Sequence, residues 1–224
     1  EYKWLFNQNF NKNHLLGLGI NSQSYENGSQ NYYNSFSLYD SELNLLNSYN
    51  KINLVPFGEF LPFENILSSI GLKTITNNYQ SFSRGNKRNI IHIKQENFSL
   101  KILPLICYEI IYSGRIFDNK DFDLIVNISE DGWFGESIGP KQHFVHNIFR
   151  AIESGKYIIR SANNGSAAII NPLGIVEKKV DFGKSGYVDF NESREIQPTV
   201  FSKFGNKMFV LLILLYIFLV FSFN

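Results

Sequence analysis

Three residues of this sequence have side chains suited to acyl-transfer chemistry. Cys107 is the only cysteine among 224 residues, and it closes the apolar run FSLKILPLIC (98–107). A thiolate is a strong nucleophile, and a nearby cation favours its formation. In the segment 51–64, Lys51 opens a short apolar strand. A tight turn rich in proline and glycine follows this strand and presents Glu59. Acyl transfer through a covalent intermediate needs a thiolate and a positive donor aimed at the negative charge that develops.

Each of these residues also has a simpler interpretation. A lone cysteine that ends an apolar strand is most often a small buried hydrophobe, and it can also form an intermolecular disulfide. Lys51 and Glu59 can equally form a solvated surface pair. Position favours a nucleophile at Cys107, because ligands bind at the carboxyl ends of the strands in an open α/β sheet.

Alternating strand and helix patterns predict an α/β fold around these residues. Several strand-like runs are almost wholly apolar, which is typical of strands covered on both faces. The clearest helix is 141–154, where apolar residues recur at three- and four-residue spacing and Gly155 follows as a stop signal. Two polar segments, 21–31 and 76–89, are predicted surface loops. The predicted strands are 14–20, 32–40, 89–93, 98–107, 122–129, 157–164 and 165–171.

Composition places the chain among ordinary globular proteins, with 44% hydrophobic and 18% charged residues. A formal net charge of +1 produces no field that would attract nucleic acid, so we expect no nucleic-acid partner. The last residues, 208–224, are uncharged and apolar on all sides, which predicts a transmembrane helix after one domain at 1–200. A buried core helix is the alternative. The start, EYKWLFNQNF, has no signal-peptide pattern and suggests a fragment.

The order of several motifs resembles the apolipoprotein N-acyltransferase family, which belongs to the nitrilase (carbon-nitrogen hydrolase) superfamily. K..LVPFGE and CYE suit the superfamily broadly, whereas WFG..IGP.QH, RA.E and SANNG are similar to the N-acyltransferases in particular. The resemblance runs from about Leu15 to the C-terminus. It implies a nitrilase-type α-β-β-α sandwich, here without its first strand and followed by the transmembrane helix.

The resemblance also implies a role for each motif residue. Cys107 would be the nucleophile, Lys51 would stabilise the oxyanion of the tetrahedral intermediate, and Glu59 would orient Lys51. Tyr108 and Glu109 would support the site. The alternative for Glu109 is that it only holds the turn after the strand. No metal or organic cofactor is expected.

Aromatic and histidine side chains raise further alternatives. Trp133 and Phe134 are either ordinary core residues or, as the family and their flanking glycines favour, a mobile loop that contacts the acyl chain. His143 and His146 have a spacing that can ligate metal, but without acidic or cysteine partners we expect surface or packing histidines. Apolar residues of the turn, among them Phe57, either pack in the core or approach the lipid surface.

The implied reaction is a two-step transfer at the bacterial inner membrane, with the catalytic domain facing the periplasm. Cys107 would take an acyl chain from the sn-1 ester of a phospholipid. The thioester would then be attacked by the α-amino group of the diacylglyceryl cysteine at the N-terminus of an apolipoprotein. Alternatives are a soluble nitrilase-like amidase acting on small amides, or an inactive membrane-anchored fragment or binding module.

Two departures from the family pattern matter. Where the family usually has Ser-Asn-Asp before the WFG loop, this chain has Ser129, Glu130 and Asp131, and we expect Glu130 to point away from the site. The family's general base is a glutamate in a proline-glutamate motif upstream of the strand 14–20, and Glu1 lies too close to that strand to be this residue. The base and the N-terminal membrane helices are therefore expected to be absent, which would leave this chain inactive by itself.

Overall fold

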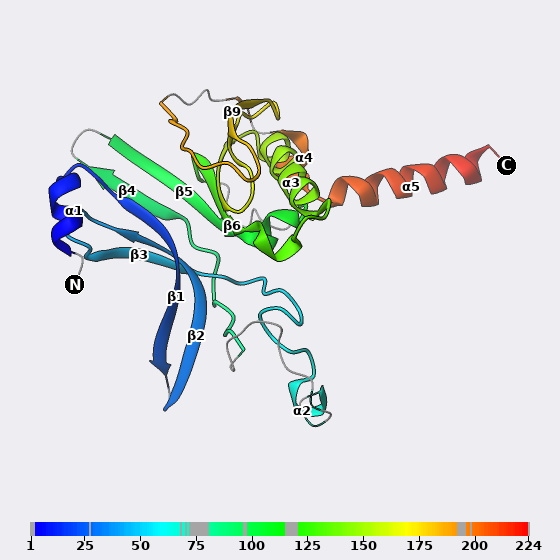
Figure 1. Cartoon of the computed structure of the whole chain (residues 1–224). Helices are drawn as coiled ribbons and strands as arrows, with labels where there is room; N and C mark the ends of the chain where they lie inside the picture. Colours follow the sequence, from blue (N-terminus) through cyan, green and yellow to red (C-terminus); the bar gives the residue numbers. More distant parts are fainter. Residues whose placement is uncertain are drawn as a thin grey trace. The chain divides into compact units, whose positions relative to one another are not determined.

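The computed structural model divides the chain into two compact units, an N-terminal unit of Glu1–Glu109 and a C-terminal unit of Ile110–Asn224 (Figure 1). Each unit is described by itself. Whether residues 1–200 work as one domain stays a prediction. The structure describes residues 3–26, 28–67, 69, 71, 81–95, 98–114, 121–191, 196–197 and 199–223.

A three-stranded antiparallel sheet forms the first part of the N-terminal unit. After the short helix α1 (Lys3–Asn9), the strands β1 (Leu16–Glu26), β2 (Ser29–Tyr39) and β3 (Leu45–Asn50) pair in that order. Figure 1 shows β1 and β2 as one long hairpin. Strand β2 lies in the centre and carries most of the core residues of this sheet, which are Tyr33, Ser35, Phe36, Ser37 and Leu38.

A second hairpin completes the N-terminal unit and leads to the only cysteine. The one-turn helix α2 (Glu64–Leu67) precedes it, and strands β4 (Ile91–Gln95) and β5 (Phe98–Ile106) pair antiparallel. The last five residues of β5 are all buried. The 3-10 helix η2 (Cys107–Ile111) begins directly after β5, so the cysteine stands at the carboxyl end of a core strand.

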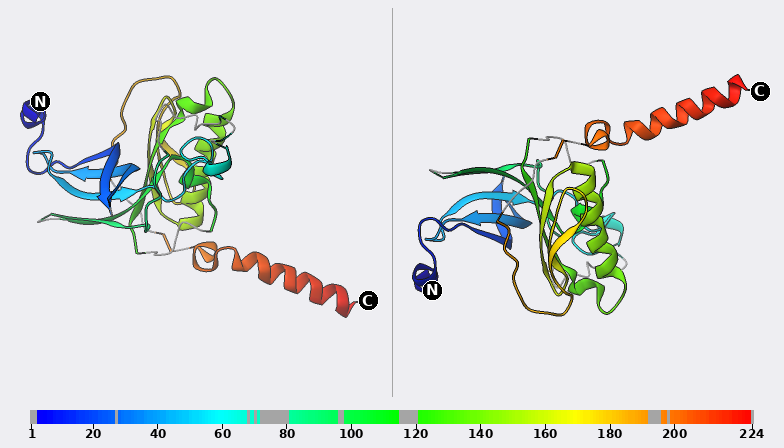
Figure 2. Two further views of the ribbon diagram at one scale, coloured as in Figure 1. Left: turned by 90° about the horizontal axis from the view of Figure 1, so that it is seen from below. Right: turned by 90° about the horizontal axis from the view of Figure 1, so that it is seen from above.

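The C-terminal unit is built around a parallel β-α-β element. Strands β6 (Leu124–Glu130) and β7 (Tyr157–Asn163) pair in parallel, and the 3-10 helix η3 (Asp131–Phe134) and the helix α3 (Gly139–Ser154) connect them. A parallel pair needs such a crossover connection. Strands β8 (Ala167–Ile170) and β9 (Val176–Val180) extend the sheet antiparallel, and α3 packs against β7 and β8 (Figure 2).

The face that α3 buries is not its apolar face. Apart from Pro140 and Ala151, the buried positions carry polar side chains, namely His143, Asn147, Arg150 and Ser154. The apolar residues expected to form one face of the helix include Val145, Phe149 and Ile152, which are between 41% and 50% exposed. The helix was predicted correctly and ends at Gly155 in a left-handed conformation, but a polar network, described below, decides which side faces inward.

Two helices end the chain, α4 (Val200–Phe204) and α5 (Lys207–Ser222). In Figure 2, α5 projects from the rest of the C-terminal unit, and none of its residues is buried. Its 16 residues span about 24 Å, less than the ~30 Å of a bilayer's hydrocarbon. Among the described residues, no helix is long and apolar enough to cross a membrane, so the predicted transmembrane helix at 208–224 is not supported.

Other sequence predictions were wrong in detail. The segment 21–31 is not a surface loop, because its described residues other than Gly28 belong to β1 and β2. Lys51 does not open a strand but follows the last residue of β3, a strand that the pattern did not predict. Strand β9 was also missed, since its central residues Glu177, Lys178 and Lys179 are charged. Of the predicted loop 76–89, residues 76–80 lie outside the described part.

Candidate active site

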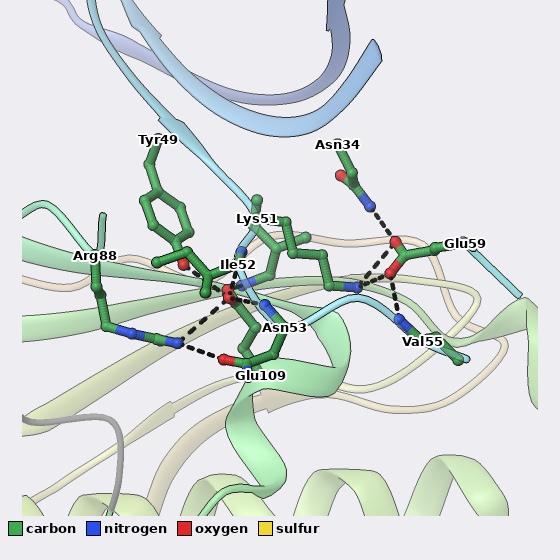
Figure 3. A network of polar contacts seen from close by, with 10 residues as sticks. Asn34, Tyr49, Lys51, Ile52, Asn53, Val55, Glu59, Arg88 and Glu109 are labelled. Carbon is green, nitrogen blue, oxygen red and sulfur yellow. Dashed lines mark hydrogen bonds and ion pairs between the residues drawn. The ribbon is translucent and has the colours of Figure 1, made fainter. Parts of the chain in front are cut away.

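A buried ion pair between Lys51 and Glu59 forms the centre of the candidate site in the N-terminal unit (Figure 3). Lys51 is 1% exposed, and its Nζ lies 2.9 Å from Oε1 and 2.8 Å from Oε2 of Glu59. The solvated surface pair that remained an alternative is therefore wrong. A lysine ammonium has three N–H donors, and these two bonds use two of them.

Glu59 is held in place by two further donors. The side-chain amide of Asn34 donates to Oε1 at 2.8 Å, and the backbone N–H of Val55 donates to Oε2 at 2.8 Å. The turn from Pro56 to Phe60 returns the chain so that this carboxylate faces Lys51. Sequence reasoning missed Asn34, which lies in β2 within a polar stretch and belongs to none of the recognised motifs.

Cys107 lies at the sharp turn where β5 becomes η2. Its φ angle is 49°, in the left-handed region that residues other than glycine rarely adopt. Such strain persists only where surrounding structure imposes it, and it is concentrated at functional sites. The side chain is half-buried, and Tyr108, the next residue of η2, is half-buried too. Cys107 is therefore not the fully buried structural thiol of the simpler interpretation.

Glu109 is completely buried and accepts hydrogen bonds on both carboxylate oxygens. Its Oε2 accepts from the backbone N–H of Ile106 at 2.9 Å, and its Oε1 accepts from the Tyr49 hydroxyl at 2.7 Å. Burial raises the pKa of Tyr49, and the negative charge of Glu109 raises it further, so Tyr49 stays a protonated donor. Oε1 also accepts from the backbone N–H groups of Ile52 and Asn53 and lies 3.4 Å from Nη2 of Arg88.

A second buried charge cluster lies in the C-terminal unit around Asp131, which is 0% exposed. Arg160 Nη2 donates to Oδ2 at 2.6 Å, while Oδ1 accepts from the Ser129 hydroxyl at 2.7 Å and lies 2.9 Å from His143 Nδ1. Desolvation raises the pKa of Asp131, but the hydrogen bond from His143 and the charge of Arg160 outweigh it and lower the pKa to about 2. We name Asp131, His143 and Arg160 the Asp131 cluster.

The aromatic pair Trp133 and Phe134 lies on η3, directly after Asp131. Trp133 is 62% exposed and Phe134 is 39% exposed, so neither is an ordinary core residue. The ring of Phe134 lies 5.5 Å from that of His143 and packs over Gly139, where an added Cβ would stand 2.5 Å from the ring. These contacts explain the spacing of WFG..IGP.QH.

Glu130 caps the start of η3. Its carboxylate accepts from the backbone N–H of Gly132 at 2.8 Å and from the side-chain amides of Asn163 and Asn164. Asn164 adopts a left-handed conformation in the turn between β7 and β8. The motifs SED and SANNG therefore meet at one carboxylate.

No group of three or more His, Cys, Asp and Glu side chains in the described part of the chain is arranged to hold a metal ion. His143 is 4% exposed and thus packs in the interior, one of the two positions expected of it, but it has an acidic partner, Asp131, that the sequence pattern did not indicate. His146 is half-buried, lies beside Phe149, and has a pKa lowered by desolvation.

The structure brings the predicted catalytic and supporting residues together in one unit. Lys51, Glu59, Cys107, Tyr108 and Glu109 all belong to the N-terminal unit, and the hydrogen bonds of Glu109 reach the backbone beside both Lys51 and Cys107. Trp133 and Phe134 belong to the C-terminal unit.

Comparisons with known proteins identify the family of the chain. The profile of the carbon-nitrogen hydrolase family matches residues 5–192. The chain is 38% identical to an apolipoprotein N-acyltransferase of Rickettsia prowazekii over 205 residues, which cover 90% of this chain and 40% of that protein. It is 37% identical to one of Bradyrhizobium diazoefficiens over 175 residues, which cover 78% of this chain and 32% of that protein. The chain thus spans well under half of either relative.

Solved structures show the same fold. Nit3 of Saccharomyces cerevisiae, a member of the nitrilase superfamily, superposes with a TM-score of 0.53 at 15% identity, covering 75% of this chain and 56% of Nit3. At this identity the likeness concerns the fold alone, and it confirms the nitrilase-type α/β fold that the motifs implied.

Proposed function

Because the chain belongs to the carbon-nitrogen hydrolase family, we propose that it carries the catalytic site of an apolipoprotein N-acyltransferase. The identity of 37% to 38% with proteins of that name supports the choice of acyl transfer over amide hydrolysis. The observation that carries the proposal is the buried Lys51–Glu59 pair, which lies in the same unit as a strained and half-buried Cys107.

In the first step, the thiolate of Cys107 attacks the carbonyl carbon of a phospholipid's acyl ester. A C–S bond forms and negative charge moves to the carbonyl oxygen. The third N–H of Lys51, which its bonds to Glu59 leave over, donates to this oxyanion, and such a donor contributes a few kcal/mol to the transition state. The C–O bond then breaks, and the lysophospholipid leaves with a proton.

In the second step, the α-amino group of a diacylglyceryl cysteine attacks the thioester. An amide bond forms, the amine loses a proton, and the thiolate of Cys107 leaves. Glu109 is unsuited to carry these protons, because it is completely buried and its oxygens accept hydrogen bonds from five groups. The family resemblance assigns that role to a glutamate upstream of β1.

Two apolar surfaces suit a lipid substrate. Helix α5 is apolar on every side and would bury that surface in the hydrocarbon of a bilayer. Phe57 and Phe63 of the turn are 49% and 80% exposed, and both have positive φ angles, a backbone conformation that costs free energy in residues other than glycine. The proposal places the protein at the bacterial inner membrane, with the catalytic site on the periplasmic side where exported apolipoproteins are modified.

The test is to detect the covalent intermediate. Protein reconstituted in phospholipid vesicles is digested and analysed by mass spectrometry, and we expect one fatty acyl group on the peptide that contains Cys107, released by hydroxylamine. Addition of a diacylglyceryl lipopeptide should move this group to the peptide's amino terminus. Cys107→Ala should abolish both signals, because no other group can form the thioester. Acyl transfer that persists in Cys107→Ala, or turnover of small amides without acylation, would contradict the proposal.

A further inference from the structure

We propose that Arg88 is a positioning residue for acyl transfer, which acts through Glu109 on the backbone that carries Lys51 and Cys107. The link to acyl transfer rests on the proposed function. The geometry belongs entirely to the N-terminal unit and stands independently of it.

Glu109 joins the two segments that carry the catalytic side chains. Its Oε1 accepts from the N–H groups of Ile52 and Asn53, at 3.0 and 3.1 Å, and these are the two residues that follow Lys51. Its Oε2 accepts from the N–H of Ile106, at 2.9 Å, the residue before the cysteine. One planar, rigid carboxylate therefore sets the position of both segments. An amide in its place would turn a donor toward one of these N–H groups, so only a carboxylate serves both.

A completely buried carboxylate needs a cation, because an unpaired buried charge is costly. Arg88 supplies it. Its side chain is 8% exposed, and Nη2 lies 3.4 Å from Glu109 Oε1 while donating at 2.7 Å to the side-chain oxygen of Asn53. Arg88 thus binds both the carboxylate and one of the residues that the carboxylate holds.

The segment that contains Arg88 also binds the backbone of Lys51 directly, through Gly85. The N–H of Gly85 donates to the carbonyl oxygen of Lys51 at 2.9 Å. A Cβ at Gly85 would stand 2.1 Å from the carbonyl oxygen of Asn50, so only glycine permits this approach. The described residues of the predicted surface loop, 81–89, form no helix or strand, as expected, and the bond from Gly85 holds them against the chain that follows β3.

Because Arg88 is present, the carboxylates of Glu59 and Glu109 do not share one cation. Figure 3 shows Glu59 and Arg88 on opposite sides of Lys51, with Glu109 on the side of Arg88. Each carboxylate has its own cation, since Lys51 bonds both oxygens of Glu59 and Arg88 faces Glu109. Without Arg88, the buried charge of Glu109 would have no cation beside it, and the carboxylate would hold the backbone next to Lys51 and Cys107 less firmly.

The test compares Arg88→Met and Arg88→Lys with a matched control, Lys87→Met, which removes a positive charge from the exposed neighbouring residue. Amide hydrogen exchange is measured at Ile52, Asn53 and Ile106. In Arg88→Met these amides should exchange about tenfold faster while the amides of β2 keep their rates, and Lys87→Met should change neither. Arg88→Lys keeps the charge and should restore most of the protection.

The second readout is the single-turnover rate of thioester formation on Cys107. At saturating phospholipid, Arg88→Met should lower this rate about 100-fold with KM unchanged, since misplacement of a donor or nucleophile by about 1 Å costs that much. Arg88→Lys should recover at least about tenfold of the loss. If Arg88→Met fails to fold, Arg88→Lys tests the proposal. Its exchange rates at the amides of Ile52, Asn53 and Ile106 should then be moderately faster than those of the parent protein.

Two results would overturn the proposal. One is faster exchange spread evenly over the unit, which would mean that Arg88 only stabilises the fold. The other is an unchanged rate of thioester formation despite faster exchange at the three amides. Failure of the proposed function looks different, because then no thioester forms in the parent protein while the exchange pattern of the variants still holds.

Discussion

The Lys51–Glu59 pair and the Asp131 cluster, both buried, differ in whether every donor of their cation is used. Lys51 and Arg160 are each 1% exposed, so burial does not distinguish them. Arg160 donates to Asn127, to Asp131 and to the carbonyl of Ser166, which occupies every nitrogen of its planar fork. The two bonds from Lys51 go to one carboxylate and leave a donor over. The difference suggests that the Asp131 cluster holds structure, whereas the Lys51 pair is available for chemistry.

Substitution of Lys51 should have the largest effect on the reaction. Lys51→Ala should lower the single-turnover rate by about 10²- to 10³-fold, because the oxyanion loses its donor. Lys51→Arg should not restore it, since a planar guanidinium cannot take the place of a compact ammonium. Glu59 keeps its bonds to Asn34 and Val55 but loses its cation, so Lys51→Ala should also lower the free energy of unfolding, and a thermal melt shows the temperature at which the variant is folded and the rate is measured. A normal kcat with only KM altered would make Lys51 a binding residue.

Substitution of Arg160 should affect stability more than chemistry. Arg160→Met leaves the buried carboxylate of Asp131 without its cation, which should lower the free energy of unfolding by about 3–5 kcal/mol. Chemical denaturation measures this, with the exposed Arg84→Met as a control that should stay within about 0.5 kcal/mol. An equal, small effect of both substitutions would contradict the structural role of the Asp131 cluster.

Much of the site was predictable from the sequence because its motifs are local. Cys107 and Glu109 lie within one short motif, and Lys51 and Glu59 lie within another, so pattern alone named all four. Asn34, Arg88 and the contacts of Glu109 were not predictable, because they join segments far apart in the chain and depend on tertiary packing.

The prediction of the fold was correct where the strands are apolar and wrong where the buried residues are polar. Strands β5, β6 and β7 were found from continuous apolar runs, whereas β3 and β9 were missed because their sequences are polar or charged. For α3, the apolar periodicity identified the helix but not its inward face, since His143 and Arg150 face the interior through side-chain hydrogen bonds. Periodicity assumes that the core is apolar, and here part of it is not.

Acid should weaken the Asp131 cluster within a defined pH range. The pKa of Asp131 is about 2 in the folded protein, against 3.8 in the unfolded chain, so its contribution is complete above about pH 4 and lost as the pH falls toward 2. The contribution is about 2 kcal/mol. Denaturation of the parent and of Asp131→Asn at pH 5 and pH 2 measures it, and the difference between the two proteins should shrink at pH 2. A constant difference would show that another group governs acid stability.

The smallest effect is expected at Glu130, directly beside Asp131 but at the half-buried rim of the cluster. Glu130→Asn introduces the residue that the family usually has there. Asparagine still offers an oxygen to the N–H of Gly132, as N-cap residues do, while the bonds from Asn163 and Asn164 are weakened by the shorter side chain.

We therefore expect a stability change below about 1 kcal/mol, and Glu130→Ala, which removes the cap altogether, should cost about 1 kcal/mol. Rates of acyl transfer should change less than about threefold in Glu130→Asn, because the carboxylate of Glu130 is engaged in capping η3 and orders Trp133 only through the backbone. Both substitutions are compared by denaturation and by single-turnover acylation. A large loss of acyl transfer with normal stability in Glu130→Asn would mean that this carboxylate takes part in the reaction. The residues around the Asp131 cluster would then not be purely structural, which would contradict the contrast with the Lys51–Glu59 pair.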